Sequence, residues 1–277
     1  MTLVAVHGIR NRQKTDDPTE AAAMLAAKWT PRLAAGYRDA GLTDPSPSVS
    51  AAYYAHLLRD GAQGTAELDH LTPQEQEWAW AWMLQAGIPA ETAQGPGTRP
   101  LRQGLDWLAR RSNVTAEAVG RLMSAFLREV YVYLTRPEVR ARCQAVVLDA
   151  ITANRANVVI AHSLGSVVTY ETLCAHPDLE VDLLLTLGSP LALPGVVFEG
   201  LVPEPRNGRA SRPAGVRRWV NIADPGDLVA LPIRLGDKFP VDLHDEAYIG
   251  KVASHSLSAY LSCGLVAAAL HPYVKPA

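Results

Sequence analysis

The sequence has few cysteines, and their arrangement indicates neither a disulfide framework nor a metal site. Only three occur in 277 residues. They stand far apart, at Cys143, Cys174 and Cys263, and no Cys-x-x-Cys or Cys/His ligand spacing accompanies them. An odd number of isolated thiols is typical of a reducing compartment. We therefore predict a cytoplasmic protein without disulfides or a bound metal.

Long apolar runs are also missing. The longest, such as residues 183–187 and 265–270, are far shorter than the roughly 20 apolar residues that span a bilayer. A strand-like run already begins at Leu3, and neither a basic leader nor an apolar signal core stands before it. We expect no transmembrane helix and no secretion signal.

Neither sign of charge dominates the chain. There are 28 acidic and 26 basic residues, for a net charge of -2, so no overall field attracts nucleic acid or an anionic membrane. Hydrophobic residues make up 48% and charged residues 19%, a balance that excludes a disordered chain. We expect one globular domain over residues 1–277. The composition carries no signal for an oligomeric state.

Apolar runs of strand length alternate with helical patterns along most of the chain. The expected strands are 3–6, 49–54, 157–161, 182–187 and 217–223. The expected helices are 19–40, 122–153 with a division at Pro137, 165–175 and 256–270. This alternation predicts an α/β fold whose central sheet is mostly parallel and is flanked by helices on both faces.

One segment, residues 58–120, breaks this rhythm. It carries a Trp-rich helical stretch, a Gly/Pro breaker and a second helical pattern. We interpret it as a helical cap inserted into the single domain. Trp78, Trp80 and Trp82 either anchor this cap to the body or form an apolar lip over a bound acyl group.

The strongest motif joins the strand expected at 157–161 to the helix that follows it. Residues 158–165 read Val-Val-Ile-Ala-His-Ser-Leu-Gly, with Ser163 in a tight turn. Small residues two positions before and after such a serine, here Ala161 and Gly165, let the strand and helix backbones cross closely. The turn would expose the hydroxyl to a helix N-terminus, where negative charge is stabilised. We interpret Ser163 as a nucleophile rather than as a simple helix cap.

This motif resembles the nucleophile elbow of the α/β-hydrolase family, although alanine replaces the usual first glycine. The resemblance continues in the right order over most of the chain and implies an α/β-hydrolase fold whose sheet begins at the family's third strand. It also implies acyl transfer through a serine ester, without a metal or an organic cofactor. The N–H of Leu164 would be one oxyanion donor. His162 would point away and serve packing or hydrogen bonding.

A second feature of the family follows the first expected strand. Residues 4–10 read Val-Ala-Val-His-Gly-Ile-Arg and resemble the His-Gly loop that supplies the other oxyanion donor in lipases and esterases. Gly8 permits the backbone to turn. The resemblance favours the N–H of Ile9 as this donor, with Arg10 as the alternative.

The acid and the base are expected after the nucleophile, in the order Ser, Asp, His. Asp227 begins an Asp-Leu-Val stretch that resembles the acid-bearing segment of many lipases, whereas Asp224 fits an Asp-Pro-Gly turn. His255 precedes the last expected helix and is assigned as the base, because imidazole exchanges protons near neutrality. His244, its rival, lies in a polar segment and is better explained as a solvated or ion-paired side chain.

The sequence thus predicts a serine hydrolase of the carboxylesterase or lipase type that cleaves a carboxylic ester or a lipid-like acyl substrate. A thioesterase, a peptidase or an acyltransferase would use the same three residues. The alternative from another class is a binding protein that keeps the fold but has no turnover. The replacement of the usual first glycine of the motif by Ala161 is the observation that raises this alternative. Ser189 and Ser256, which stand in motifs of similar appearance, are interpreted as structural.

Overall fold

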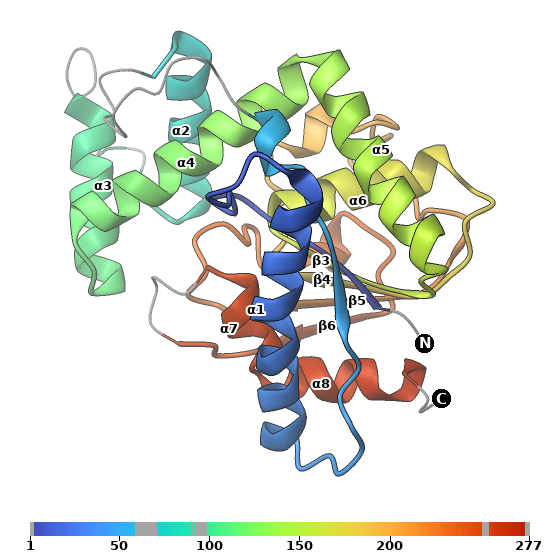
Figure 1. Ribbon diagram of the computed structural model, residues 1–277. Helices are drawn as coiled ribbons and strands as arrows, with labels where there is room; N and C mark the ends of the chain where they lie inside the picture. Colours follow the sequence, from blue (N-terminus) through green and yellow to red (C-terminus); the bar gives the residue numbers. More distant parts are fainter. Residues whose placement is uncertain (1–2, 59–70, 90, 92–98, 251–254, 275–277) are drawn as a thin grey trace.

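The structure is a computed structural model that describes residues 3–58, 71–89, 91, 99–250 and 255–274 (Figure 1). Six strands form one sheet, in the order β2-β1-β3-β4-β5-β6, and every pair is parallel. The strands are β1 (Leu3–Val6), β2 (Val49–Ala52), β3 (Val158–His162), β4 (Val181–Leu187), β5 (Val216–Ala223) and β6 (Leu243–Glu246). The predicted α/β class is confirmed, and the described sheet is entirely rather than mostly parallel.

Helices cover both faces of this sheet. They are α1 (Pro18–Asp39), α2 (Pro73–Gln85), α3 (Arg99–Ser112), α4 (Ala116–Thr135), α5 (Pro137–Asn154), α6 (Leu164–Ala175), α7 (Leu257–Leu261) and α8 (Gly264–Leu270). Helix α1 packs with α7 and α8 on one face, and α5 packs with α6 on the other. Helices α2 and α3 lie together on one side of the molecule, away from both termini (Figure 1).

The two-residue period of the strands divides the core into two clusters. In β1, Val4 and Val6 pack toward α5 and α6, whereas Leu3 and Ala5 pack toward α1. The central strands are buried on both faces, so they read as continuous apolar runs. This explains why the sequence predicts β1 and β3 almost to the residue.

Strand β6 is missing from the sequence prediction. It pairs with β5 at the edge of the sheet, and its four residues, Leu-His-Asp-Glu, are half-buried or exposed. An edge strand with one paired side needs no apolar run. His244 is therefore a strand residue, and of the two expected environments the ion-paired one is nearer, because its Nε2 lies 4.0 Å from the Glu246 carboxylate.

The expected single helix over residues 256–270 is wrong. The chain forms α7 and α8 with a break at Ser262 and Cys263. Gly264, the first residue of α8, packs so closely on the end of α1 that a Cβ there would lie 2.8 Å from the backbone nitrogen of Ala40. Its N–H donates to the Asp39 carboxylate at 2.7 Å. This contact with a distant helix redirects the chain.

The predicted cap corresponds to α2, α3 and the start of α4. Its expected end at residue 120 falls inside α4, so this helix continues from the cap into the body. Residues 59–70, 90 and 92–98 of the predicted cap lie outside the described residues. Trp82 is fully buried and donates its indole N–H to the carbonyl of Leu228 at 2.7 Å. Trp82 therefore anchors α2 to the rest of the described structure and is not part of an apolar lip.

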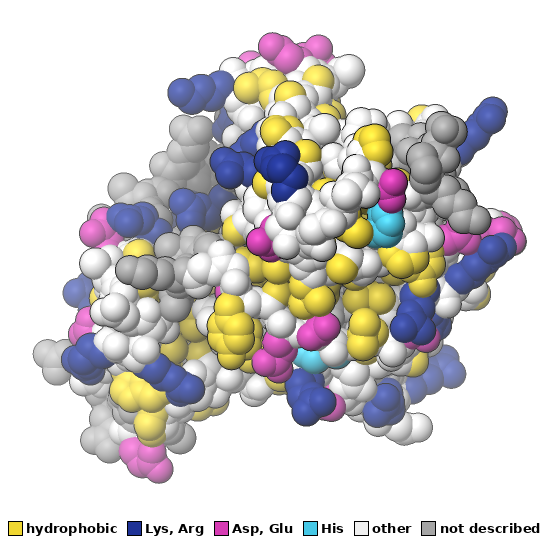
Figure 2. Space-filling model, turned by 90° about the horizontal axis from the view of Figure 1, so that it is seen from below, with side chains coloured by type: hydrophobic (Ala, Val, Ile, Leu, Met, Phe, Trp, Pro, Cys, Tyr) yellow, Lys and Arg dark blue, Asp and Glu magenta, His cyan; other side chains and the backbone are white. Residues whose placement is uncertain are grey.

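Membrane-spanning character is absent from the part of the chain that the structure describes, since no helix there is both long and apolar enough to cross a bilayer. Figure 2 shows basic and acidic side chains interspersed over one face of the molecule. That face carries no field of a single sign.

Candidate active site

The topology of the sheet singles out one place for a site. From β1 the chain goes to β2 on one side and then returns to β3 on the other side of β1. In open parallel sheets, ligands bind outside the carboxyl ends of the strands where the order reverses in this way. The residues at these two ends are His7 and Gly8 after β1 and Ser163 after β3. The two motifs found in the sequence therefore meet at the switch point.

Ser163 has a backbone conformation that non-glycine residues rarely adopt. Its φ is 54° and its ψ is -133°, and such a residue persists only where its surroundings impose the conformation. Its N–H donates to the carbonyl of Leu187 at 3.1 Å, which extends the β3–β4 pairing up to the turn. Ser166 donates its hydroxyl to the carbonyl of Ser163 at 2.6 Å. These contacts hold the serine in a sharp turn between β3 and α6.

Two glycines allow the backbones to approach this turn. A Cβ on Gly8 would lie 2.3 Å from the Cβ of Ser163 and 2.8 Å from its Oγ. A Cβ on Gly165 would lie 2.3 Å from the carbonyl oxygen of His7. Ala161 is a fully buried strand residue paired with Val6 and Thr186, and its methyl group packs in the core. Alanine is therefore accommodated where the family usually has glycine.

We expect Gly8→Ala to lower any turnover that depends on Ser163 by about 100-fold or more, because the new methyl group must displace the Ser163 side chain, and displacements of about 1 Å have such effects. Steady-state rates measured together with thermal unfolding would separate this local effect from loss of the fold. Gly236→Ala is the control, since its Cβ would make only ordinary contact at 3.5 Å. Equal activity of Gly8→Ala and the wild type would mean that Gly8 does not shape the turn.

Three side chains from separate segments form a continuous hydrogen-bonded chain. The Nε2 of His255 lies 2.8 Å from the Oγ of Ser163, and its Nδ1 lies 2.8 Å from the Oδ2 of Asp227. The side chains of His255 and Asp227 are each 2% exposed. The three residues that the sequence predicts as nucleophile, base and acid are thus brought together.

The surroundings of Asp227 favour its ionised form. Burial alone would raise the pKa of Asp227, but the charge of His255 and hydrogen bonds from His255 and the Val229 amide together hold it below its usual value. An ionised carboxylate accepts the Nδ1–H of His255, which leaves Nε2 free to accept the proton of the Ser163 hydroxyl. The chain of contacts therefore selects the tautomer that a general base needs.

Tyr260, on α7, is a further member of the site that the sequence did not reveal. Its hydroxyl donates to the Oδ2 of Asp227 at 2.9 Å and accepts from the N–H of Asp224 at 3.0 Å. Burial raises the pKa of Tyr260 well above its usual value, and the Asp227 charge adds to this, so the phenol stays protonated. A tyrosine within an apolar helical pattern carries no sequence signal for such a role.

The alternative acid and base do not join the triad. Asp224 accepts from the amides of Gly226 at 2.7 Å and Ile249 at 2.8 Å, which makes it the turn-forming residue that the sequence predicts. His244 lies on β6, and its Nδ1 contacts the Asn221 side chain at 3.0 Å. Burial lowers the pKa of His244. Neither side chain contacts His255 among the described residues.

The two structural serines also occupy other positions. Ser256 caps α7 by accepting from the amide of Ala259 at 3.3 Å. The hydroxyl of Ser189 contacts the hydroxyl of Ser166 at 2.7 Å. Both serines therefore have local structural partners, and only Ser163, among the described serines, has an imidazole on its hydroxyl.

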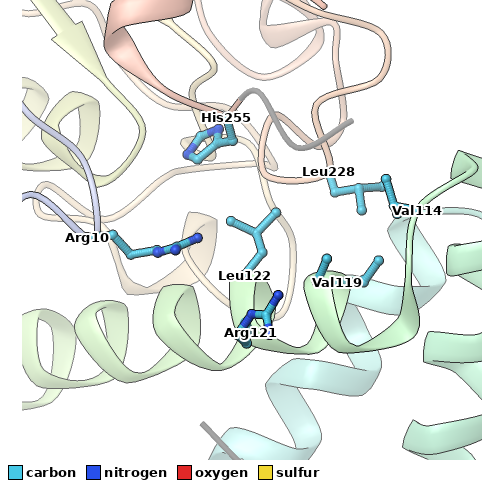
Figure 3. Close-up of a pocket in the computed structure, with 8 residues that line it drawn as sticks. Arg10, Val114, Val119, Arg121, Leu122, Leu228 and His255 are labelled. Atoms are coloured by element: carbon cyan, nitrogen blue, oxygen red, sulfur yellow. The ribbon is translucent and has the colours of Figure 1, made fainter. Parts of the chain in front are cut away.

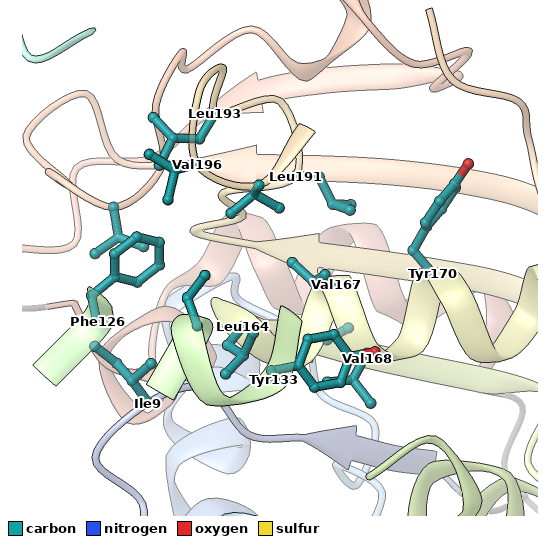
Figure 4. Close-up of a cluster of buried hydrophobic side chains, with 14 of the residues drawn as sticks. Ile9, Phe126, Tyr133, Leu164, Val167, Val168, Tyr170, Leu191, Leu193 and Val196 are labelled. Carbon is teal, nitrogen blue, oxygen red and sulfur yellow. The ribbon is translucent and has the colours of Figure 1, made fainter. Parts of the chain in front are cut away.

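The backbone around the turn offers two amides for an oxyanion. Leu164 is the first residue of α6, and an amide there has no acceptor within its own helix. The N–H of Arg10 donates to Glu129 at 2.9 Å and is already engaged. This leaves Ile9, the predicted donor, as the candidate in the loop after β1. Figure 4 shows the Ile9 and Leu164 side chains in one apolar cluster with Phe126 and Leu191.

His7 holds the loop after β1 in place through hydrogen bonds with Tyr54. Its Nε2 accepts from the N–H of Tyr54 at 3.1 Å, and its carbonyl accepts from the Tyr54 hydroxyl at 2.6 Å. Burial lowers the pKa of His7 to about 4, so the ring is neutral near pH 7. His7 thus positions the loop and carries no charge to the site.

His162 packs beneath the candidate base. Its ring lies 4.6 Å from the ring of His255, and both its nitrogens lack a hydrogen-bond partner among the described residues. Burial lowers the pKa of His162 well below its usual value. Of the two roles that the sequence left open, packing is the one observed.

Glu129, on α4, holds the loop after β1 by accepting a hydrogen bond from the Arg10 amide. Burial raises the pKa of Glu129 to about 7 from 4.5, against the opposing effect of the Arg10 amide. A raised carboxyl pKa means that the folded state loses stability as pH rises between these two values, because the ionised form is disfavoured in the fold. We expect this loss to reach about 3 kcal/mol relative to Glu129→Gln, which keeps the amide contact.

Urea unfolding of both proteins at a series of pH values from 4 to about 8 measures this difference. The wild type should be destabilised relative to Glu129→Gln as pH rises. The matched control is Glu117→Gln, which removes a carboxylate that is 77% exposed on the same helix. A constant difference between wild type and Glu129→Gln over the whole range would contradict the prediction.

Taken together, the geometry can transfer a proton from a serine hydroxyl to imidazole and stabilise negative charge beside two amides. Among the described residues, no group of three or more His, Cys, Asp or Glu side chains is arranged to hold a metal ion. Comparison of this chain with protein-family models, with curated proteins and with solved structures finds no match.

Proposed function

We propose that this protein is a serine hydrolase of the α/β-hydrolase type that cleaves a carboxylic ester or a lipid-like acyl substrate. One observation carries the proposal: Asp227, His255 and Ser163 form an unbroken chain with two contacts of 2.8 Å. These residues come from three separate segments, and packing alone gives no reason to bury them in this order. The strained conformation of Ser163 adds support, since strain of this kind gathers at functional sites.

Strand order and strand direction bear on the finer fold assignment. The order of the six strands differs from that of the complete α/β-hydrolase sheet. A hydrolase core that begins at the family's third strand would lack the early antiparallel strands, and an all-parallel sheet is consistent with this. The candidate nucleophile follows β3 and the His-Gly loop follows β1, which is the arrangement that the sequence predicted.

The proposed reaction proceeds in two halves. His255 accepts the Ser163 proton as Oγ attacks the substrate carbonyl, and the amides of Ile9 and Leu164 stabilise the resulting oxyanion. His255 then gives this proton to the departing alcohol oxygen, and an acyl-serine ester remains. Water attacks this ester with His255 again as base, which releases the acid and restores the serine. Asp227 stays ionised throughout.

The compartment remains a prediction of the sequence. Cys143, Cys174 and Cys263 are all unpaired thiols in the structure. This supports the expected reducing, cytoplasmic location.

Labelling with a fluorophosphonate tests the proposal directly. We expect one probe per chain, attached to the peptide that contains Ser163. His255→Ala should lose this labelling, because the hydroxyl is no longer activated, whereas His244→Ala should retain it. A wild type that does not react would refute the serine hydrolase and favour a binding protein of this fold. Thioesters, amides and alcohol acceptors, offered to the unlabelled enzyme, would then separate esterase from thioesterase, peptidase and acyltransferase.

A further inference from the structure

Two cavities adjoin His255, and basic side chains line both. The first, which we name the α4 cavity, has a volume of about 260 Å³ and lies between His255 and α4. Its lining residues are Arg10, Val114, Ala118, Val119, Arg121, Leu122, Leu228 and His255. The second has a volume of about 250 Å³, shares Arg10, Leu122 and His255 with the first, and adds Lys28. The described lining of either cavity includes no acidic residue.

Arg10 is the basic residue common to both cavities. Figure 3 shows its side chain extending from the loop after β1 toward Leu122, between His255 and α4. Its backbone has a φ of 59° and its amide is bound by Glu129, so the start of the side chain is held in place. Within the described residues, its guanidinium makes neither a hydrogen bond nor an ion pair. Arg10 therefore presents an available cation beside the candidate base.

The acidic residues close to Arg10 and Arg121 neutralise only part of the positive charge of these two side chains. Glu129 faces Arg10, but burial raises the pKa of Glu129 to about 7, so it is only partly ionised at neutral pH. Arg121 pairs with Glu117, and the two side chains are 51% and 77% exposed. Pairs this exposed contribute little, and Arg121 can exchange Glu117 for another anion. The cavity thus retains a net positive character.

The remaining walls limit the size of what binds. Apolar surface lies between the two arginines and the imidazole of His255. It comes from Val119 and Leu122 on α4 and from Leu228, which follows Asp227. A cavity of about 260 Å³ lies below the roughly 300–1,000 Å³ of pockets for drug-sized ligands. A short chain fits this space better than a long fatty acyl group.

We propose that the α4 cavity binds an anionic group of the substrate through Arg10 and Arg121, so that the enzyme cleaves short esters that carry a carboxylate or a phosphate. Guanidinium groups match the geometry of both anions and bind them with two parallel hydrogen bonds. This inference rests on the proposed function and narrows its substrate class from esters and lipids in general to short anionic esters.

Three chromogenic esters of similar length test it. 4-Nitrophenyl hexanoate is neutral, mono-4-nitrophenyl adipate carries its charge on the acyl chain, and 3-hexanoyloxy-4-nitrobenzoate carries it on the leaving group. We expect kcat/KM for one of the anionic esters to exceed that of the neutral ester by about tenfold or more, mainly through KM. The preferred ester shows which half of the substrate carries the charge.

Matched variants assign the preference to the cavity. Arg10→Gln and Arg121→Gln should each lower the ratio of anionic to neutral kcat/KM, Arg10→Lys should lower it less than Arg10→Gln, and Lys28→Gln should leave it unchanged. The ratio is the readout because Arg10 adjoins the oxyanion loop, and its replacement can change both rates. A ratio near one in the wild type, or a ratio that only Lys28→Gln lowers, overturns the proposal.

The same experiment separates this inference from the proposed function. Ser163-dependent turnover of the neutral ester with no anionic preference overturns the anion site alone. If no ester is cleaved and no probe binds, the serine hydrolase fails. Calorimetric binding of all three esters to Ser163→Ala still tests the cavity in that case. Equal affinity for the neutral ester and both anionic esters would overturn it, and tighter binding of either anionic ester that Arg10→Gln abolishes would support it.

Discussion

Ser163→Ala is expected to abolish ester cleavage and fluorophosphonate labelling while the protein remains folded. Its hydroxyl is the only serine oxygen among the described residues in contact with an imidazole, at 2.8 Å from His255. Removing the nucleophile of the subtilisin triad costs about 10⁶ in kcat, and some catalysis is left from binding and the oxyanion donors. Alanine keeps the Cβ, so the packing against Gly8 is unchanged.

Turnover of a short aryl ester and urea unfolding, measured on the same preparation, check both parts of this expectation. Ser189→Ala is the matched control, because Ser189 is also buried beside the turn but bonds to Ser166. It should keep its activity. Substantial ester turnover by Ser163→Ala that persists through further purification would place the nucleophile elsewhere.

Asp227→Asn is expected to reduce turnover by about 10⁴, the loss found for the equivalent change in a serine protease. The amide cannot stabilise the protonated imidazole, and its NH₂ group next to the Nδ1 of His255 favours the wrong tautomer. The Val229 amide donates to the other carboxylate oxygen, Oδ1, so the asparagine oxygen stays at that position and the NH₂ group takes the position that faces His255 and Tyr260. This makes the orientation of the amide unfavourable for His255.

Asp224→Asn is the comparison, because it lies three positions away in the same segment. Its two carboxylate oxygens accept from the amides of Gly226 and Ile249. Asparagine has one acceptor oxygen, so one buried amide loses its partner, at a cost of about 1–3 kcal/mol in stability. Turnover at pH 8 should be largely retained. An inactive Asp224 variant beside an active Asp227 variant would reverse the assignment of the acid.

Much of the fold and of the candidate site follows from local patterns. Strands buried on both faces must be apolar throughout, which is why β1 and β3 are evident in the sequence. The turn at Ser163 depends on the missing side chain of Gly165, two positions after it. The role of Asp224 depends on a neighbouring amide, that of Gly226, only two residues away. In each case the residues that cause the local structure lie in the same short segment as the residues whose structure is predicted.

The other features depend on partners that are distant along the chain. Tyr260 is 33 residues from Asp227, and Glu129 is 119 residues from Arg10, so no local pattern marks either contact. Strand β6 is stabilised by its pairing with β5 and has no apolar run of its own.

The sequence by itself determined the α/β class, the turn at Ser163 and the order of the three candidate residues, because these depend on burial and on backbone sterics over a few positions. Only the tertiary structure decided that His255 rather than His244 contacts the Ser163 hydroxyl. It also decided that the Arg10 amide donates to Glu129 and that two arginines, Arg10 and Arg121, line one cavity. Those outcomes follow from how the helices pack on the sheet, which brings together side chains that the chain keeps far apart.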